Sequence, residues 1–265
     1  MPFLTHDGLS LAYDEAGAGD PPMLFVHGWC CDRTHFAPQM EHFASRHRVV
    51  AVDLRGHGES ARPDDGQYTL DIFADDLAWI CGELGLRKPV VVGHSMGGAV
   101  TLNLAARHPQ LPAAIVMLDA PVFLPGDAVD AARALVDAFR STACHDVLRQ
   151  FFDQRLFIDT DDAQRKQRIL GEIDGTRPHV VASSFESILD FDAEAAAGAC
   201  RAPALYVGAD RALTDVKRFR GLCPQLMVGQ TVGAGHFHQL EVPDQVNAMI
   251  ERFLAVSLAP ATTRP

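Results

Sequence analysis

The sequence predicts an α/β protein with a mainly parallel sheet, helices on both faces of that sheet and an inserted helical cap. Short apolar runs alternate with amphipathic stretches through the first 120 residues, as in strands joined by right-handed helical crossovers. Only helical patterns follow from residue 122 to about residue 200, and strand-like runs then return. We therefore expect a core of residues 1–121 and 201–265 that is interrupted by a cap of residues 122–200.

The elements of the core follow from hydrophobic periodicity and from turn residues. Valine-rich runs such as residues 89–92 are typical of parallel strands that are buried on both faces. The predicted strands cover residues 9–16, 23–26, 48–52, 89–92, 114–118, 204–207 and 230–232. The predicted core helices cover residues 70–84, 96–107 and 246–256. The predicted cap helices cover residues 128–139, 145–152, 161–173 and 178–189.

Composition and charge exclude several classes of protein. The 265 residues carry a formal net charge of -11, and an acidic surface repels nucleic acid and anionic lipid, so we expect neither as a partner. No apolar run reaches the roughly 18 residues of a membrane span, and the N-terminus shows no signal peptide pattern. The six cysteines lack the spacing of a metal site and are expected to be free thiols. We expect a cytoplasmic protein that acts on a small molecule; the sequence is also compatible with a homo-oligomer.

The strongest local pattern is Gly93-His94-Ser95-Met96-Gly97. It lies between a valine-rich strand and an alanine-rich helix, where a tight turn exposes the serine hydroxyl above the carboxyl edge of the sheet. The glycines allow the backbone to make that turn, and the start of the helix favours developing negative charge. We expect Ser95 to be a nucleophile; the alternative is a purely structural turn.

A serine hydroxyl is a weak nucleophile and needs a base. The chain has 12 histidines, so the context of each one decides. His236 ends the glycine-rich loop of residues 233–236, directly after the last predicted strand, and such a loop can reach back over the sheet edge. We therefore expect His236 to be the base. His238 is the nearest alternative and is expected to point elsewhere.

The base needs a carboxylate that fixes its tautomer and stabilises the imidazolium. Asp210 directly follows the strand of residues 204–207, which places it at the same sheet edge, and it is the favoured candidate. Asp119 ends the strand of residues 114–118 and is an alternative. Asp215 is a second alternative, although it can instead cap the following helix.

Donors for the oxyanion of a tetrahedral intermediate are expected from two backbone N–H groups. Met96 follows the nucleophile at the start of its helix, and Trp29 lies in the loop after the strand of residues 23–26. One such donor contributes about 10²–10³ in rate. The Trp29 side chain can line the pocket at the same time.

Four segments then resemble the landmark segments of the α/β-hydrolase superfamily, in the right order and over nearly the whole chain outside residues 122–200. They are HGW at 27–29, DLRGHGES at 53–60, GHSMGG at 93–98 and GAGHFHQLEVPD at 233–244. The resemblance is to the capped branch that contains esterases, lactonases and carbon–carbon hydrolases. It implies the α/β-hydrolase fold with an eight-stranded sheet, a helical cap and no cofactor or metal.

The resemblance also implies roles for individual residues. It gives the nucleophile as Ser95, the acid as Asp210 and the base as His236, with oxyanion donors from Trp29 and Met96. It gives structural rather than chemical roles to Asp53, Arg55 and His57. One departure concerns the acid: many relatives carry G-x-x-D, whereas Gly208-Ala209-Asp210 is one residue shorter, and this keeps Asp119 and Asp215 as alternatives.

The function expected from these residues is cleavage of a small-molecule carboxylic ester through an acyl-enzyme. Alternatives on the same site are a lactonase, a carbon–carbon bond hydrolase, a perhydrolase and a cofactor-free dioxygenase, because fold alone does not choose among chemistries. A non-catalytic ligand-binding protein is a further alternative. In the cap, apolar pocket residues could come from Phe123, Phe139, Phe151, Phe152 and Phe157. A substrate carboxylate could be bound by Arg133, Arg140, Arg149 or Arg155, although these are spaced like solvated helix residues.

Overall fold

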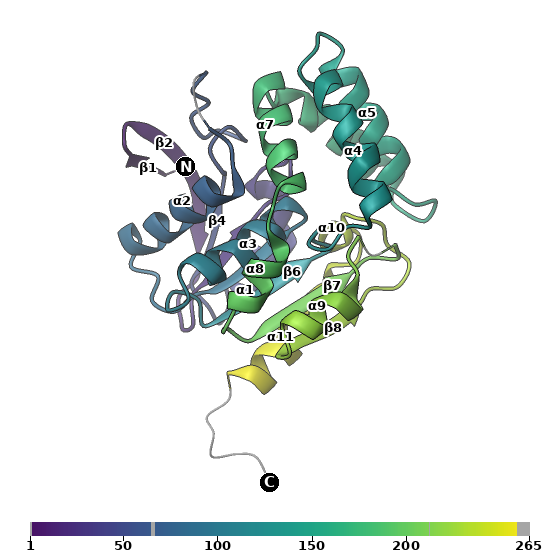
Figure 1. The fold of residues 1–265 in the computed structure, drawn as a ribbon. Helices are drawn as coiled ribbons and strands as arrows, with labels where there is room; N and C mark the ends of the chain where they lie inside the picture. Colours follow the sequence, from purple (N-terminus) through teal and green to yellow (C-terminus); the bar gives the residue numbers. More distant parts are fainter. Residues whose placement is uncertain (1, 65–66, 212, 259–265) are drawn as a thin grey trace.

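The structure is a computed structural model, and it describes residues 2–64, 67–211 and 213–258. Eight strands form one sheet in the order β1-β2-β4-β3-β5-β6-β7-β8 (Figure 1), as predicted. The strands are β1 (Phe3–His6), β2 (Leu9–Ala16), β3 (Met23–Val26), β4 (Val49–Val52), β5 (Val90–His94), β6 (Ala114–Leu118), β7 (Ala204–Gly208) and β8 (Leu226–Gln230).

The register of the central strands brings their carboxyl ends to one edge of the sheet. β1 and β2 are antiparallel, β2 is antiparallel to β4, and the remaining neighbours are parallel. His94 of β5 lies opposite Leu118 of β6, and Leu118 lies opposite Val207 of β7. The residues that directly follow β5, β6 and β7 are therefore neighbours in space, although they are far apart in sequence.

Helices cover both faces of the sheet (Figure 1). On one face, α1 (Ala37–Phe43) and α11 (Pro243–Ser257) pack against the alternate side chains of the central strands. The other face is covered by α2 (Leu70–Glu83) and α3 (Met96–Arg107), with α9 (Val216–Leu222) over β7 and β8. A short helix, α10 (His238–Glu241), precedes α11, and two 3₁₀ turns cover Arg33–Phe36 and Ile173–Gly175. The strands between these layers are buried because apolar side chains cover both faces.

The predicted cap segment folds into helices that stand beyond the carboxyl edge of the sheet. They are α4 (Gly126–Phe139), α5 (Cys144–Arg155), α6 (Ala163–Glu172) and α7 (Pro178–Leu189), and α4 packs against both α5 and α7 (Figure 1). The last helix of the segment, α8 (Ala193–Ala199), instead packs its alanines against α3 of the core. The helices over the sheet edge are therefore α4 to α7.

The predicted strand at residues 230–232 is wrong in its position. β8 covers Leu226–Gln230 and pairs with β7. Val232 is exposed, and its N–H donates to the Gln245 side chain at 2.9 Å rather than to a neighbouring strand. An edge strand with one solvated face lacks the continuous apolar run that marks a buried strand, and Met227 of β8 is indeed exposed.

Two composition-based expectations can be compared with the structure. All six cysteines are free and buried, as predicted. Within residues 2–64, 67–211 and 213–258, none of the helices combines the length and the apolar character needed to span a bilayer.

Candidate active site

Ser95 sits on a strained turn between β5 and α3. Its φ of 53° and ψ of -122° are unusual for a residue other than glycine, and its N–H donates to the Leu118 carbonyl at 2.8 Å. A Cβ on Gly93 would overlap the carbonyl of Gly97, and a Cβ on Gly97 would overlap the carbonyl of Val26. The two glycines are therefore required by close backbone approach, as expected for a nucleophile on a strand-to-helix turn.

A cavity of about 670 Å³ lies between this sheet edge and the cap helices. Ser95 is partly exposed and lies on its wall, as does His236. Most of the wall is apolar, and nearly half of its lining residues come from α4, α5 and α7. The lining side chains include Trp29, Pro121, Leu124, Leu135, Phe151, Phe152, Leu156, Phe185, Ile188, Leu189, Leu213 and Phe237. A predominantly apolar pocket with a few convergent polar groups is the usual form of a small-molecule site.

His236 is held by three hydrogen bonds that fix its ring and its backbone. Its Nδ1 lies 2.7 Å from Oδ2 of Asp119. Its N–H donates to the Leu156 carbonyl at 3.0 Å, and its carbonyl accepts from Nε2 of His94 at 2.9 Å. Since Asp119 occupies Nδ1, we assign the proton to that nitrogen, which leaves Nε2 with its lone pair. No hydrogen bond joins the Ser95 hydroxyl to His236 within the described chain, and such bonds commonly tighten only when substrate binds.

The structure places Asp119, and not the favoured Asp210, in contact with His236. Asp210 is exposed, and its N–H donates to the Ala234 carbonyl at 3.1 Å, whereas Asp119 is buried and contacts His236. The reason is the strand order: Asp119 follows β6, which pairs directly with β5, the strand that precedes Ser95, while Asp210 follows β7, one strand farther away. Asp215 caps α9 by accepting from the Arg218 N–H at 3.0 Å.

Neighbouring donors keep Asp119 ionised. Its Oδ1 accepts from the N–H groups of Ala209 and Leu213 at 3.3 and 3.4 Å and from the Tyr206 hydroxyl at 3.4 Å. Burial alone would raise the pKa of Asp119, but its interactions with His236, His238 and the Ala209 N–H together outweigh burial, and the pKa lies below its ordinary value. A charged Asp119 can stabilise a protonated His236 ring.

Two further histidines lie near His236 and are neutral. Burial lowers the pKa of His94 well below its ordinary value, with His236 and His238 adding to the effect. Burial likewise lowers the pKa of His238 to about 4. His238 bonds to the Thr231 hydroxyl at 3.0 Å and does not line the cavity, in agreement with the expectation that it points elsewhere. Sequence reasoning missed His94 as a support for the His236 loop, although it is part of the motif around Ser95.

The two predicted oxyanion donors are available. Within the described residues, the N–H groups of Trp29 and Met96 form no hydrogen bond. Trp29 lies in a tight turn in which the Cys31 N–H donates to the Gly28 carbonyl at 3.2 Å. A Cβ on Gly28 would lie 3.1 Å from the Cβ of Ser95, so this turn runs close beside Ser95.

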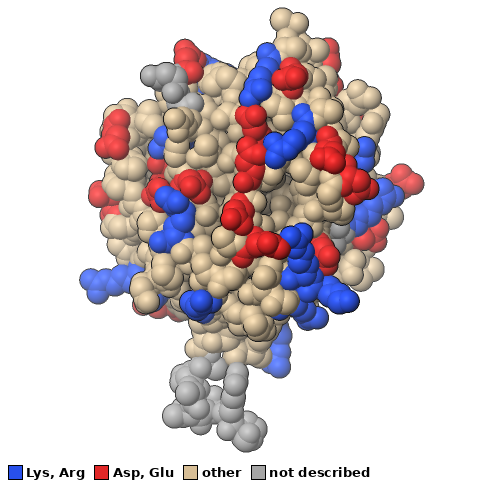
Figure 2. Space-filling model, in the orientation of Figure 1, with Lys and Arg blue, Asp and Glu red and all other residues tan. Residues whose placement is uncertain are grey.

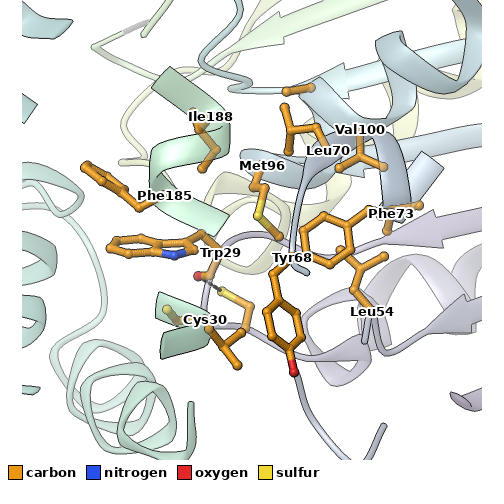
Figure 3. Close-up of a cluster of buried hydrophobic side chains, with 14 of the residues drawn as sticks. Trp29, Cys30, Leu54, Tyr68, Leu70, Phe73, Met96, Val100, Phe185 and Ile188 are labelled. Carbon is orange, nitrogen blue, oxygen red and sulfur yellow. Dashed lines mark hydrogen bonds between the residues drawn. The ribbon is translucent and has the colours of Figure 1, made fainter. Parts of the chain in front are cut away.

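The Trp29 side chain joins the core to the cap. Its indole N–H donates to the Val181 carbonyl of α7 at 3.1 Å, and its ring lies 4.7 Å from that of Phe185. Figure 3 shows Trp29 and Phe185 facing each other, with Met96 and Ile188 nearby. Trp29 therefore lines the cavity with its side chain and directly follows Gly28, which lies close to Ser95.

The remaining predicted residues form ion pairs or pack against aromatic side chains. Asp53 is buried and forms an ion pair with Arg33, and Arg55 pairs with Asp76.

The five cap phenylalanines fall into two groups. The cavity is lined by Phe151 and Phe152. Outside the lining, Phe139 packs against Trp29, Phe157 against Phe237 and Phe123 against Phe219. The sequence did not single out Phe185 and Phe237 as lining residues. Within the described residues, no group of three or more His, Cys, Asp or Glu is arranged to hold a metal ion.

Residues 21–243 match the family of proteins with the alpha/beta hydrolase fold. The chain belongs to this family. The matched segment covers most of the chain, and it includes the turn around Ser95 and the loop that carries His236. The fold predicted from the resemblance is therefore confirmed.

Several hydrolases are similar to this chain. The chain is 36% identical over 130 residues to 2-(acetamidomethylene)succinate hydrolase of Mesorhizobium japonicum, which covers 49% of this chain and 46% of the relative. It is 40% identical over 116 residues to a bifunctional esterase/perhydrolase of Acinetobacter calcoaceticus. This match covers 43% of this chain and 42% of the relative. The chain thus spans about half the length of curated relatives such as these. A solved structure of a thermophilic esterase from Thermogutta terrifontis superimposes with a TM-score of 0.85 at 26% identity and covers 97% of each chain.

Proposed function

We propose that the protein is a serine hydrolase that cleaves small-molecule carboxylic esters through an acyl-enzyme. The observation that carries this proposal is the 2.7 Å contact between His236 and Asp119 on the wall of the cavity that also exposes Ser95. A hydroxyl on a strained turn, an imidazole and a buried carboxylate that bonds to it are the groups that acyl transfer requires. The similarity to esterases is in keeping with this chemistry.

In the proposed first half-reaction, Nε2 of His236 takes the proton from the Ser95 hydroxyl as its oxygen attacks the ester carbonyl. The resulting oxyanion accepts hydrogen bonds from the N–H groups of Trp29 and Met96. Asp119 stabilises the imidazolium, and His236 then passes the proton to the leaving alkoxide. The products of this half-reaction are the free alcohol and an ester on Ser95.

In the second half-reaction, His236 takes a proton from water, and the hydroxide attacks the acyl-enzyme. The oxyanion is bound by the same two N–H groups, and the proton on His236 returns to the Ser95 oxygen as the acid leaves. The water enters from the cavity. The apolar wall of α4, α5 and α7 would hold the non-reacting part of the ester.

The test compares wild type with Ser95→Ala on 4-nitrophenyl acetate and butyrate. We expect Ser95→Ala to lose at least about 10³-fold in kcat, because removal of a nucleophile leaves only binding and oxyanion stabilisation. A matched control is Ser141→Ala, an exposed serine away from the cavity, which should keep full activity. Fluorophosphonate labelling should occur in wild type and in the control but not in Ser95→Ala.

The same assay separates ester cleavage from the other reactions that such a site can catalyse. A panel of acyl esters, lactones, a ring-fission diketone and an ester with added hydrogen peroxide gives a ratio of rates for each. Full esterase activity in Ser95→Ala would overturn the proposal. Absence of both Ser95 labelling and turnover of any substrate would instead favour a ligand-binding role.

A further inference from the structure

The charged residues on the cavity wall are all of one sign. Among the described residues, the wall includes Arg155 and Arg211 but no aspartate or glutamate. A wall with basic but no acidic residues is unexpected, because the chain has 34 acidic and only 23 basic residues. On the outer face seen in Figure 2, acidic and basic side chains are interspersed. The cavity therefore differs in charge from the surface around it.

Arg155 is also unusual among the arginines of the cap segment. Each of the others forms an ion pair with a carboxylate; they are Arg133, Arg140, Arg149, Arg165, Arg168 and Arg177. The side chain of Arg155 has no ion pair or hydrogen bond with any described residue, and the same is true of the Arg211 side chain in the core. Both guanidinium groups keep all their donors for another partner.

The two arginines flank the loop that carries His236. Arg155 precedes Leu156, whose carbonyl accepts the His236 N–H at 3.0 Å. Arg211 follows Asp210, whose N–H donates to the Ala234 carbonyl at 3.1 Å. Each arginine is thus one residue away from a backbone hydrogen bond to residues 234–236, one from the cap side and one from the core side. Both arginines therefore leave the backbone next to the loop that carries His236, and both line the cavity.

We infer that Arg155 and Arg211 bind a carboxylate of the substrate, so that the enzyme prefers esters with an additional negative charge. This inference rests on the proposed function and names its substrate class. Arginine matches a carboxylate through parallel, charge-assisted hydrogen bonds. A wall without acidic residues avoids the repulsion that would otherwise oppose such a ligand.

The experiment uses two matched pairs of esters. One pair places the charge on the acyl side, as 4-nitrophenyl hemisuccinate against 4-nitrophenyl pentanoate. The other places it on the alcohol side, as 4-carboxyphenyl acetate against its neutral methyl ester. We expect wild type to prefer the anionic ester in at least one pair. In Arg155→Gln/Arg211→Gln, kcat/KM for that ester should fall by about 10- to 100-fold, the range expected when hydrogen bonds to a charged group are lost.

Controls distinguish a charge effect from loss of structure. The double variant should hydrolyse the neutral esters within about twofold of wild type, and its KM for the anionic ester should no longer rise with added salt. Arg149→Gln, on the same helix as Arg155 but paired with Asp174, should behave as wild type on both pairs. Equal losses on charged and neutral esters, or no preference for either anionic ester in wild type, would overturn the inference. The proposed function fails separately, through an active Ser95→Ala.

Discussion

The two walls of the cavity are built in opposite ways. The core wall carries His236, whose ring and backbone are held by hydrogen bonds to Asp119, His94 and Leu156. The cap wall is apolar, and its one guanidinium group, that of Arg155, has no partner among the described residues. Side chains that must be placed within a fraction of an ångström are buried and bonded, whereas side chains that meet the substrate are left free. Substitutions of the hydrogen-bonded residues of the core wall should therefore affect every substrate, and substitutions of the unpaired Arg155 and Arg211 should affect selectivity.

The largest effect is expected from the acid of the core wall. Asp119→Asn should lower kcat by about 10³–10⁴-fold on every ester, because an amide favours the wrong tautomer of His236. Asp210→Asn is the matched control, since Asp210 also follows a strand of the same sheet edge but is exposed; it should stay within about twofold of wild type. Steady-state kinetics on 4-nitrophenyl butyrate measure both. The opposite ranking of the two variants would assign the acid to Asp210.

The contrast between Ser95 and Asp119 explains what the sequence could predict. The turn around Ser95 is a local structure, since Gly93, Gly97 and the flanking strand and helix are consecutive in sequence. The sequence also predicted the His236 loop, because its glycines directly follow the last strand. The partner of His236 depends on which loop lies nearest in space, and this is set by the order of β5, β6 and β7. A local pattern places both Asp119 and Asp210 at the sheet edge but does not rank their distances to His236.

The accuracy of the fold prediction also depended on whether a local sequence pattern marks the element. Buried central strands and long amphipathic helices were predicted nearly to the residue, as for α3 at Met96–Arg107. The edge strands β1 and β8 were missed or misplaced because solvent covers one of their faces. α8 was not predicted as a separate helix, because a short run of alanines has no clear polar face. The sequence named Arg155 among four cap arginines but could not separate it from the paired ones, since ion pairing in the cap depends on carboxylates that are distant in sequence, and it did not name Arg211.

The buried histidines of the core should make the folded protein less stable in mild acid. Burial lowers the pKa of His27 and His238 to about 4 and of His57 to about 3, and lowers that of His94 well below its ordinary value. Each folded-state pKa lies below the unfolded value of 6.5, so as pH falls from 6.5 to about 4 the unfolded chain binds protons that the folded protein does not. Stability should fall with pH by up to about 1.4 kcal/mol per pH unit for each of these rings.

Urea unfolding at pH 7 and pH 5, followed by tryptophan fluorescence, measures this loss. The lowered pKa of Asp119 contributes only below about pH 4 and does not affect the window. His238→Asn removes one titrating ring, so its stability should depend less steeply on pH, whatever the substitution does to stability at pH 7. Equal free energies of unfolding at pH 7 and pH 5 in wild type would contradict the prediction.

The smallest effect concerns the point at which the two walls meet. Asp161 follows α5 and accepts from the N–H groups of Ile158 and Gly235 at 2.8 and 2.7 Å. It thereby joins the cap to the residue before His236. Asp161→Ala should lower kcat by about 10-fold on charged and neutral esters alike and leave KM nearly unchanged, because a displaced base slows the chemical step without altering the pocket.

Asp161→Asn is expected to recover most of that loss, because the amide oxygen can still accept from one of the two N–H groups. The matched control is Asp159→Ala, an exposed aspartate of the same turn with no hydrogen bond in the described chain. If Asp161→Ala raised KM for the anionic ester alone, the turn would act on recognition through Arg155 and not on His236. The segment of residues 155–161 includes Arg155 on the cap wall and Asp161, which bonds to the loop that carries His236. Comparing the effects of substitutions in this segment on kcat and on KM therefore measures how far chemistry and selectivity are separated in this protein.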